Sequence, residues 1–304
     1  MAKKIIYILT LYITLSACSK DFLNQVPDDR LTIDQVFQRR ETTEQYLHGV
    51  YSYIKDEANQ WTSNPWVGAA DEADMTWARE GYNSYFMNLG SWDPTSNFFL
   101  FWDHYYMGIR SATYFIENAG ENPEILRLTN GRELLDRYIA EARALRAYYY
   151  FCLVRQYGPV IILEGDYTLP VDASLEDLQI PRNSMDECVD YILSELNKAM
   201  PFLPEWYNDK FMSDNDYGRV TTSFIKALKA RLLLYAASPL YNGNSEYSGF
   251  TNADGKQLIN QSYSEDKWRV AAAAAKEVID ISRFALYEVR NGDEIDAYTS
   301  YRDM

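Results

Sequence analysis

Cysteine is scarce in this chain of 304 residues and occurs only at Cys18, Cys152 and Cys188. So few cysteines exclude a disulfide-stabilised scaffold, the class in which several bridges replace a large hydrophobic core. Cys152 and Cys188 fall in two predicted helices and would pair only if those helices were neighbours. We favour buried free thiols at both positions, because cysteine packs well as a small apolar residue.

Histidine is scarcer still, with only His48 and His104, and each lies in a predicted helix. Neither belongs to a metal-binding H-E-x-x-H pair, and the chain has no G-x-S-x-G elbow, P-loop or paired C-x-x-C. The sequence therefore predicts a protein that is not an enzyme and uses no cofactor and no metal. A surface glycoside hydrolase stays open as an alternative, because its two carboxylates are paired in space rather than in sequence.

Basic residues are in deficit, with 29 Lys and Arg against 44 Asp and Glu and a formal net charge of −15. An acidic surface of this size argues against nucleic acid as a partner and against adsorption to anionic lipid. It is compatible with neutral ligands.

Long apolar runs are absent except at the start of the chain, where residues 5–15 follow two lysines. This run is too short to span a bilayer and is typical of a signal peptide, predicted over residues 1–17. It leads into Leu15-Ser16-Ala17-Cys18, a lipobox that predicts lipid attachment at Cys18 and cleavage just before it. The alternative is an ordinary secretory signal with an incidental cysteine. The lipobox predicts a mature protein, from residue 18 to 304, that is tethered to a membrane without crossing it.

Helical periodicity of apolar residues is frequent, whereas regular strand signals are nearly absent. Ser184 and Glu187 form a capping box, Thr221 and Ser264 are further N-cap candidates, and Gly158-Pro159 and Pro201 mark helix ends. Six helices are predicted, over about 42–55, 96–118 and 131–156 and in the stretches that begin after Ser184, Thr221 and Ser264. The last of them is expected to turn one apolar side inward, formed by Trp268, Ala271, Ala272, Ala275 and Ile279.

Two long irregular stretches, 58–95 and 236–261, interrupt the helical pattern, and the extended stretch 159–183 is expected to hold one or two short strands. The predicted fold is mainly α, with tetratricopeptide-like helix pairs forming a scaffold, long irregular loops and few short strands. Each pair in such a scaffold buries its apolar face against its neighbours.

The stretch 58–95 is the best candidate for a ligand site, because aromatic rings in loops stack on the apolar faces of sugars. We select Trp77, Tyr82 and Trp92 as ligand-binding residues; the alternative is that these rings only pack the loop onto the scaffold. The acidic run at 71–74 lacks the spacing of a calcium loop and is interpreted as a solvated turn. Arg143 and Arg146, which lie among aromatic residues of one helix, are expected to form salt bridges or cation–π contacts.

Several segments share their order and spacing with one known family. The strongest is 141–151, which reads EARALRAYYYF and leads to QYGPV at 156–160. The others are 18–27, 46–51, 180–184, 218–221 and 234–239. Together they resemble the SusD/RagB family of nutrient-uptake lipoproteins of Bacteroidetes, over nearly the whole mature chain.

The resemblance implies a surface lipoprotein of the outer membrane that captures glycan, or in some members peptide, for a TonB-dependent SusC-like transporter. It also implies a tetratricopeptide-like scaffold that contacts this transporter and a shallow ligand site built from loops. Members are substantially longer, so the chain is expected to be an N-terminal portion of such a protein, with residues 18–304 as an incomplete helical domain. A non-catalytic helical-repeat adaptor that docks on the transporter is a further alternative to glycan capture.

Overall fold

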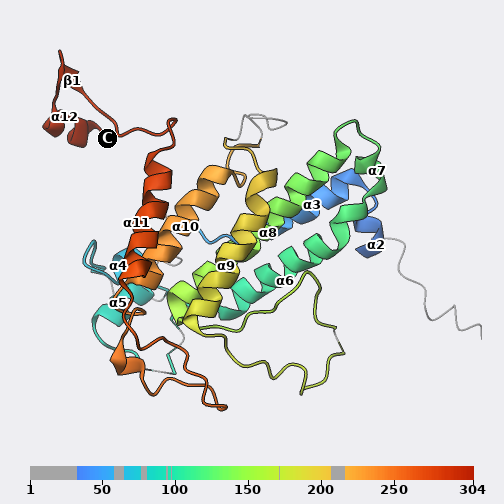
Figure 1. Cartoon of the computed structure of the whole chain (residues 1–304), viewed down its shortest axis with the longest axis horizontal. Coiled ribbons are helices and arrows are strands. Elements are labelled where there is room, and N and C mark those ends of the chain that lie inside the picture. Colours follow the sequence, from blue (N-terminus) through green and yellow to red (C-terminus); the bar gives the residue numbers. More distant parts are fainter. Residues whose placement is uncertain are drawn as a thin grey trace, which may run out of the picture.

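The computed structural model describes residues 33–57, 65–76, 81–93, 95–96, 98–170, 172–206 and 216–304. The described chain is a stack of long helices with irregular loops at its two ends (Figure 1). The long helices are α3 (Arg40–Tyr51), α6 (Trp102–Asn118), α8 (Gly131–Tyr157), α9 (Met185–Ala199), α10 (Thr222–Ala237) and α11 (Glu265–Ile279). The short elements are α2 (Ile33–Val36), α4 (Pro65–Gly68), α5 (Asn83–Asn88), η2 (Ala119–Glu121), α7 (Pro123–Leu126), η3 (Met200–Phe202), η5 (Ser245–Tyr247), β1 (Arg290–Asn291), β2 (Glu294–Ile295) and α12 (Ala297–Asp303).

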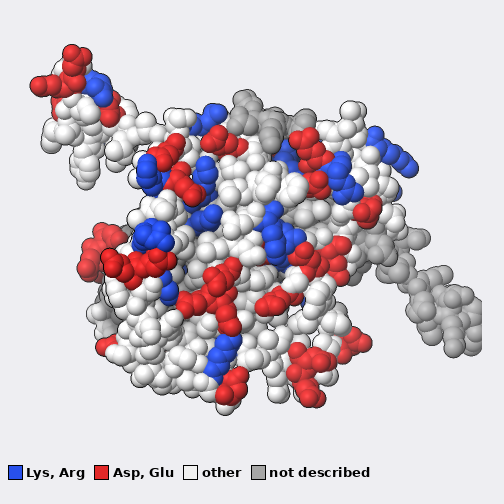
Figure 2. All heavy atoms as spheres, in the orientation of Figure 1, with Lys and Arg blue, Asp and Glu red and all other residues white. Residues whose placement is uncertain are grey.

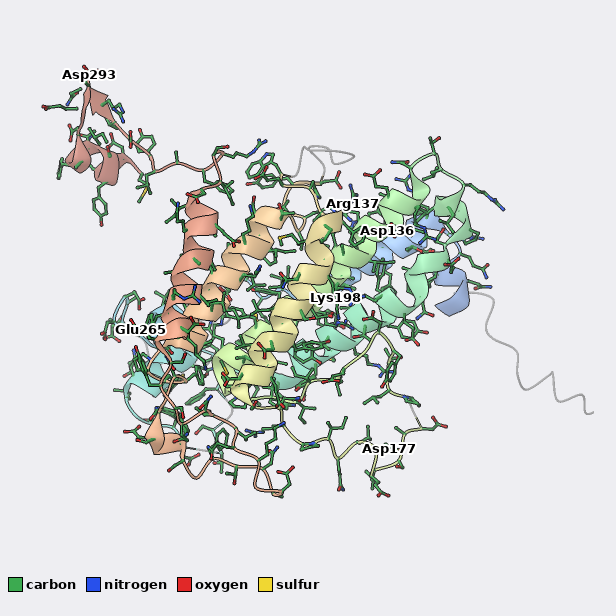
Figure 3. All side chains as sticks on the ribbon, viewed as in Figure 1. Asp136, Arg137, Asp177, Lys198, Glu265 and Asp293 are labelled. Carbon is green, nitrogen blue, oxygen red and sulfur yellow. The ribbon has the colours of Figure 1, made fainter. Side chains whose placement is uncertain are left out.

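Helix α8 is the centre of the hydrophobic core. It contacts α3, α6, α7, α9 and α10, and apolar side chains are buried on every side of it over most of its length. Its middle combines alanines, which let neighbouring helices approach closely, with tyrosines whose rings fill the spaces between them. Figure 3 shows side chains filling the space between the long helices.

Predicted capping signals fix the starts of two later helices. The Ser184 hydroxyl accepts from the Glu187 amide while the Glu187 carboxylate accepts from the Ser184 amide, so the capping box of α9 is complete. The Thr221 hydroxyl accepts from the amide of Phe224 at the start of α10. Ser264 is the N-cap residue of α11 but makes no side-chain cap hydrogen bond.

Helices that follow one another in sequence also pack side by side. Contacts join α6 to α8, α8 to α9, α9 to α10 and α10 to α11, as in a scaffold where helices bury apolar side chains against their neighbours. This arrangement confirms the predicted mainly α fold with a tetratricopeptide-like scaffold. In the described part of the chain no helix is long and apolar enough to cross a membrane.

The prediction of strands within 159–183 is wrong for the residues described there, 159–170 and 172–183. Their backbone groups bond to side chains and loops instead of to a neighbouring strand. The Ile162 amide donates to Asn183 Oδ1 at 2.9 Å, and the Leu163 amide donates to Tyr150 Oη at 2.9 Å. The described part has one two-stranded sheet, in which β1 and β2 pair antiparallel near the C-terminal end.

The predicted inward face of the last long helix is also wrong in part. Ala271 is buried, but Trp268 is 38% exposed and Ile279 is 77% exposed, and Ala272 and Ala275 are exposed as well. Among the described helices α11 packs mainly on α10, so only the narrow stripe of Ala271 and Ala274 is covered. Amphipathic spacing identifies an apolar stripe but does not state how much of it a neighbour covers.

Cys152 on α8 and Cys188 on α9 are both buried free thiols, as predicted. Burial raises the pKa of each thiol to about 11, which keeps both protonated and unreactive at neutral pH. The predicted signal peptide, residues 1–17, and the predicted lipid-bearing Cys18 lie outside the described residues.

Candidate functional site

Trp92 is held just past the end of α5 by a helix-terminating motif. The Ser91 amide donates to the Phe86 carbonyl at 3.0 Å and the Gly90 amide donates to the Met87 carbonyl at 2.9 Å. This pair of hydrogen bonds is a Schellman motif, which requires a left-handed residue at its turn; Gly90 supplies it with a φ of 68°.

A second turn fixes the backbone on the other side of Trp92. The Asp93 carboxylate accepts from the Thr95 amide at 2.8 Å and from the Thr95 hydroxyl at 2.7 Å, and the Asp93 amide donates to Ser96 Oγ. These hydrogen bonds hold the pKa of Asp93 below its ordinary value. The Trp92 side chain nevertheless stays 56% exposed, so a large ring is presented to solvent from an ordered backbone.

Of the other two predicted ligand residues, the structure describes only Tyr82. Tyr82 is the N-cap residue of α5 and is half-buried. Helix α5, with a rise of about 9 Å, and residues 89–91 separate it from Trp92. Trp77 lies outside the described residues.

Helix α5, which precedes Trp92, packs against α4 in a small buried layer. Ser84 and Met75 are buried against Gly68, and Asn88 Nδ2 donates to the Gly68 carbonyl at 2.9 Å. Asn88 Nδ2 also lies 3.3 Å from Asp74 Oδ1, which places this acidic residue in a packing contact. The loop that carries Trp92 therefore follows a helix that is fixed by buried contacts with Gly68.

A residue with an unfavourable backbone conformation lies shortly before α6. Phe99 has a φ of 50°, the only positive value of a non-glycine residue in the described part of the chain. Such a conformation costs on the order of 1–3 kcal/mol and persists where surrounding contacts enforce it. Here Phe99 and Phe101 are both buried, while Leu100 between them is 61% exposed. We name residues 81–101 the aromatic segment.

Three consecutive residues in the last turn of α8 contact this segment and the residues Glu57 and Trp66, which precede it in sequence. Arg155 pairs with Glu57 and stacks on Trp66, Gln156 donates to the Phe99 carbonyl, and Tyr157 accepts from the Phe101 amide. Sequence reasoning used 156–160 only as a mark of family resemblance. Three polar or amphipathic residues in a row directly precede the helix-ending Gly158. This run is the sequence signal that could have indicated these contacts.

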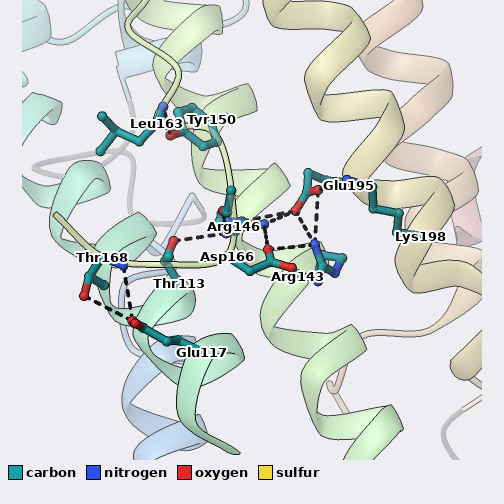
Figure 4. Close-up of polar contacts among 11 residues, drawn as sticks. Thr113, Glu117, Arg143, Arg146, Tyr150, Leu163, Asp166, Thr168, Glu195 and Lys198 are labelled. Atoms are coloured by element: carbon teal, nitrogen blue, oxygen red, sulfur yellow. Dashed lines mark hydrogen bonds and ion pairs between the residues drawn. The ribbon is translucent and has the colours of Figure 1, made fainter. Parts of the chain in front are cut away.

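A hollow lies beside α6, with a volume of about 640 Å³. Ile109, Thr113 and Ile162 are the buried residues of its lining, and Met107 and Tyr167 are exposed ones. Neither Tyr82 nor Trp92 lines this hollow. Its wall at 163–168 is fixed by polar contacts with α6 and α8 (Figure 4).

Three described carboxylates with displaced pKa values, Glu141, Glu195 and Asp166, are paired with arginines. Burial raises the pKa of Glu141, but this residue is fully buried and paired with Arg137 and Arg219. Arg146 and Arg143 contact both Glu195 and Asp166. Among the described residues, no group of three or more His, Cys, Asp or Glu side chains could hold a metal ion. Figure 2 shows acidic and basic side chains interspersed over one face, without an extended basic surface.

Comparison with known proteins gives a consistent result. Residues 21–232 match the SusD-like family described as "Starch-binding associating with outer membrane". A SusD-like protein of Bacteroides ovatus is 26% identical over 249 residues, which are 82% of this chain and 42% of that protein.

Solved structures show the same similarity. The selenomethionine form of BT4246 is 26% identical with a TM-score of 0.61, covering 86% of this chain and 41% of the other. A SusD-like protein described as laminarin-binding is 18% identical with a TM-score of 0.54, covering 84% of this chain and 45% of the other. The chain thus spans less than half the length of these three relatives.

Proposed function

Because the chain belongs to the SusD-like family, we propose that it captures glycan at the cell surface and passes it to a TonB-dependent SusC-like transporter of the outer membrane. The observation that carries the proposal is Trp92, a largely exposed ring between two hydrogen-bonded turns. A rigid ring loses little conformational freedom on binding, which suits stacking on the apolar face of a sugar.

The proposed site is the aromatic segment, with Trp92 and Tyr82 as ligand contacts, together with Trp77, which precedes the segment, as a third contact. The family description names starch, and one structural relative is described as binding laminarin. Both are reasons to expect a glycan ligand, whereas peptide is the alternative. In this proposal the protein is a binding module that performs no hydrolysis, and its scaffold contacts the transporter.

A panel of soluble oligosaccharides, including fragments of starch and laminarin, tests the proposal when titrated into the protein from Ser19 onward. We expect one glycan class to bind and to be released chemically unchanged after prolonged incubation. A shortened glycan would support the glycoside hydrolase alternative. Binding of peptides in place of every glycan would contradict the proposed ligand class.

Membrane attachment has its own test, because we propose that Cys18 carries the lipid anchor. A Cys18→Ser variant expressed in its natural host should leave the outer-membrane fraction, since the thiol that accepts the lipid is gone. A Cys152→Ser variant is the matched control, because this buried thiol lies in the core and should not affect localisation. Retention of the Cys18→Ser protein in the outer membrane would rule out anchoring at this residue.

A further inference from the structure

The last turn of α8 contacts three separate parts of the chain around the proposed ligand site. Arg155, Gln156 and Tyr157 are consecutive, yet each holds a different backbone or side-chain group. Leu153 and Val154, which precede them, are buried, and the Gly158 amide closes the helix by donating to the Val154 carbonyl at 2.9 Å. The three side chains therefore project from a rigid base.

Arg155 contacts Glu57, which follows α3, and Trp66, which lies in α4. Its Nη2 lies 2.5 Å from Glu57 Oε1, and its guanidinium carbon lies 4.3 Å from the centre of the Trp66 ring. The arginine is buried, which strengthens both contacts relative to an exposed pair. A planar guanidinium makes the stacking contact and the ion pair together, whereas a lysine ammonium lacks the planar surface for stacking.

Gln156 acts on the strained end of the aromatic segment. Its Nε2 donates at 2.5 Å to the carbonyl of Phe99, the residue with a φ of 50°. This hydrogen bond supplies one of the contacts that keep Phe99 in a conformation which L-residues rarely adopt.

Tyr157 holds the next backbone group along the chain. Its hydroxyl accepts from the Phe101 amide at 2.9 Å, and its ring packs edge-on against Trp102 at 5.3 Å between ring centres. The start of α6 is thereby fixed to the end of α8, and the exposed Leu100 lies between the groups held by Gln156 and Tyr157.

We propose that Arg155, Gln156 and Tyr157 are positioning residues for ligand capture, which hold Trp66, Phe99 and Phe101 in the arrangement that the bound ligand requires. The inference rests on the proposed function for its ligand. None of the three needs to touch the ligand. They raise affinity because a site that is ordered before binding loses less conformational entropy when the ligand arrives.

Hydrogen exchange measured by mass spectrometry tests the positioning without any ligand. Tyr157→Phe keeps the ring and removes the hydroxyl that accepts from Phe101. We expect peptides covering 98–102 to exchange about fivefold faster or more, the usual effect of one lost hydrogen bond on local opening. Tyr150→Phe is the matched control, because its hydroxyl accepts from the Leu163 amide on the same helix but away from the aromatic segment. Equal exchange of residues 98–102 in both variants would overturn the inference.

Binding separates a positioning role from a merely structural one. With the tightest oligosaccharide of the panel as probe, Tyr157→Phe should bind about threefold to tenfold more weakly, the equivalent of one hydrogen bond's net contribution. Tyr150→Phe should bind as the wild type does, although it loses a comparable hydrogen bond. Arg155→Lys, which keeps the charge facing Glu57, should also weaken binding because the stack on Trp66 is lost. Unchanged affinity in both Tyr157→Phe and Arg155→Lys would refute the positioning role.

The two proposals fail in different ways. If no glycan binds the wild type, the proposed function fails, while the exchange of residues 98–102 still decides whether α8 orders the segment. If glycan binds and neither variant differs from Tyr150→Phe, the proposed function stands and the positioning role falls.

Discussion

Glu195→Ala should lower the free energy of unfolding by about 3–5 kcal/mol, because it leaves a buried arginine without its main partner. Glu195 on α9 is 2% exposed, and Arg146 on α8 is 1% exposed. Arg146 donates to Glu195 through both Nε and Nη2, and its remaining hydrogen bonds reach Asp166, Thr113 and the Gly165 carbonyl (Figure 4). Urea unfolding of the two proteins measures the difference.

The matched control is Asp190→Ala, which removes an exposed acid from the same helix and should change stability by less than about 0.5 kcal/mol. Acid titration adds a second check. Burial acts to raise the pKa of Glu195, but the charge and hydrogen bonds of Arg146 outweigh it and the pKa is lowered. Its stabilising effect is therefore present above the ordinary carboxyl pKa and is lost as pH falls through the lowered value. A Glu195→Ala protein as stable as Asp190→Ala would contradict this account of the α8–α9 contact.

Glu141→Ala is expected to have an effect of similar size, about 3–5 kcal/mol, at the opposite side of α8. Glu141 is fully buried and accepts from Tyr51 Oη at 2.7 Å and from Arg219 Nε at 2.9 Å. Arg137 lies 3.3 Å away. The carboxylate thereby joins α3, α8 and the residues before α10, and among the described residues its loss leaves Arg137 and Arg219 with only the more distant Asp216 as an acidic partner.

Replacing Glu141 and Glu195 by glutamine should lower the free energy of unfolding by different amounts. Burial raises the pKa of Glu141, so the folded protein favours its neutral form more than water does, whereas the pKa of Glu195 is lowered. A neutral isostere should therefore be tolerated better at 141 than at 195. Urea unfolding of Glu141→Gln and Glu195→Gln checks the order, and a larger loss of stability at 141 would contradict it.

Local signals predicted much of the fold. The capping box at Ser184 and Glu187 and the Thr221 cap set helix starts in the sequence itself, and both are present. Salt bridging by Arg143 and Arg146 was also expected from their place among aromatic residues. The partner Glu195 was not, because it lies 49 residues from Arg146 and only helix packing brings the two together.

The errors have a common physical origin. The stretch 159–163 has strand composition, but its amides find partners in side chains such as Asn183 and Tyr150, which sequence does not reveal. The spacing of α11 predicts an apolar face, yet coverage of that face depends on neighbours beyond the helix itself.

The candidate site was also predictable only in part from the sequence. Exposed aromatic residues in a loop were predictable from composition, and Trp92 has that environment. The contacts of Arg155, Gln156 and Tyr157 were not predictable, because each connects residues 55 or more positions apart in sequence.

The central claim is that Trp92 presents a rigid ring to the bound glycan. Isothermal titration of the tightest oligosaccharide into the wild type, Trp92→Ala and Trp268→Ala tests it most directly. Trp268, on α11, is an exposed tryptophan outside the aromatic segment and serves as the matched control. The account predicts that Trp92→Ala weakens binding about tenfold or more, as loss of an aromatic anchor does, while Trp268→Ala binds like the wild type. Equal affinities of the two variants would contradict it.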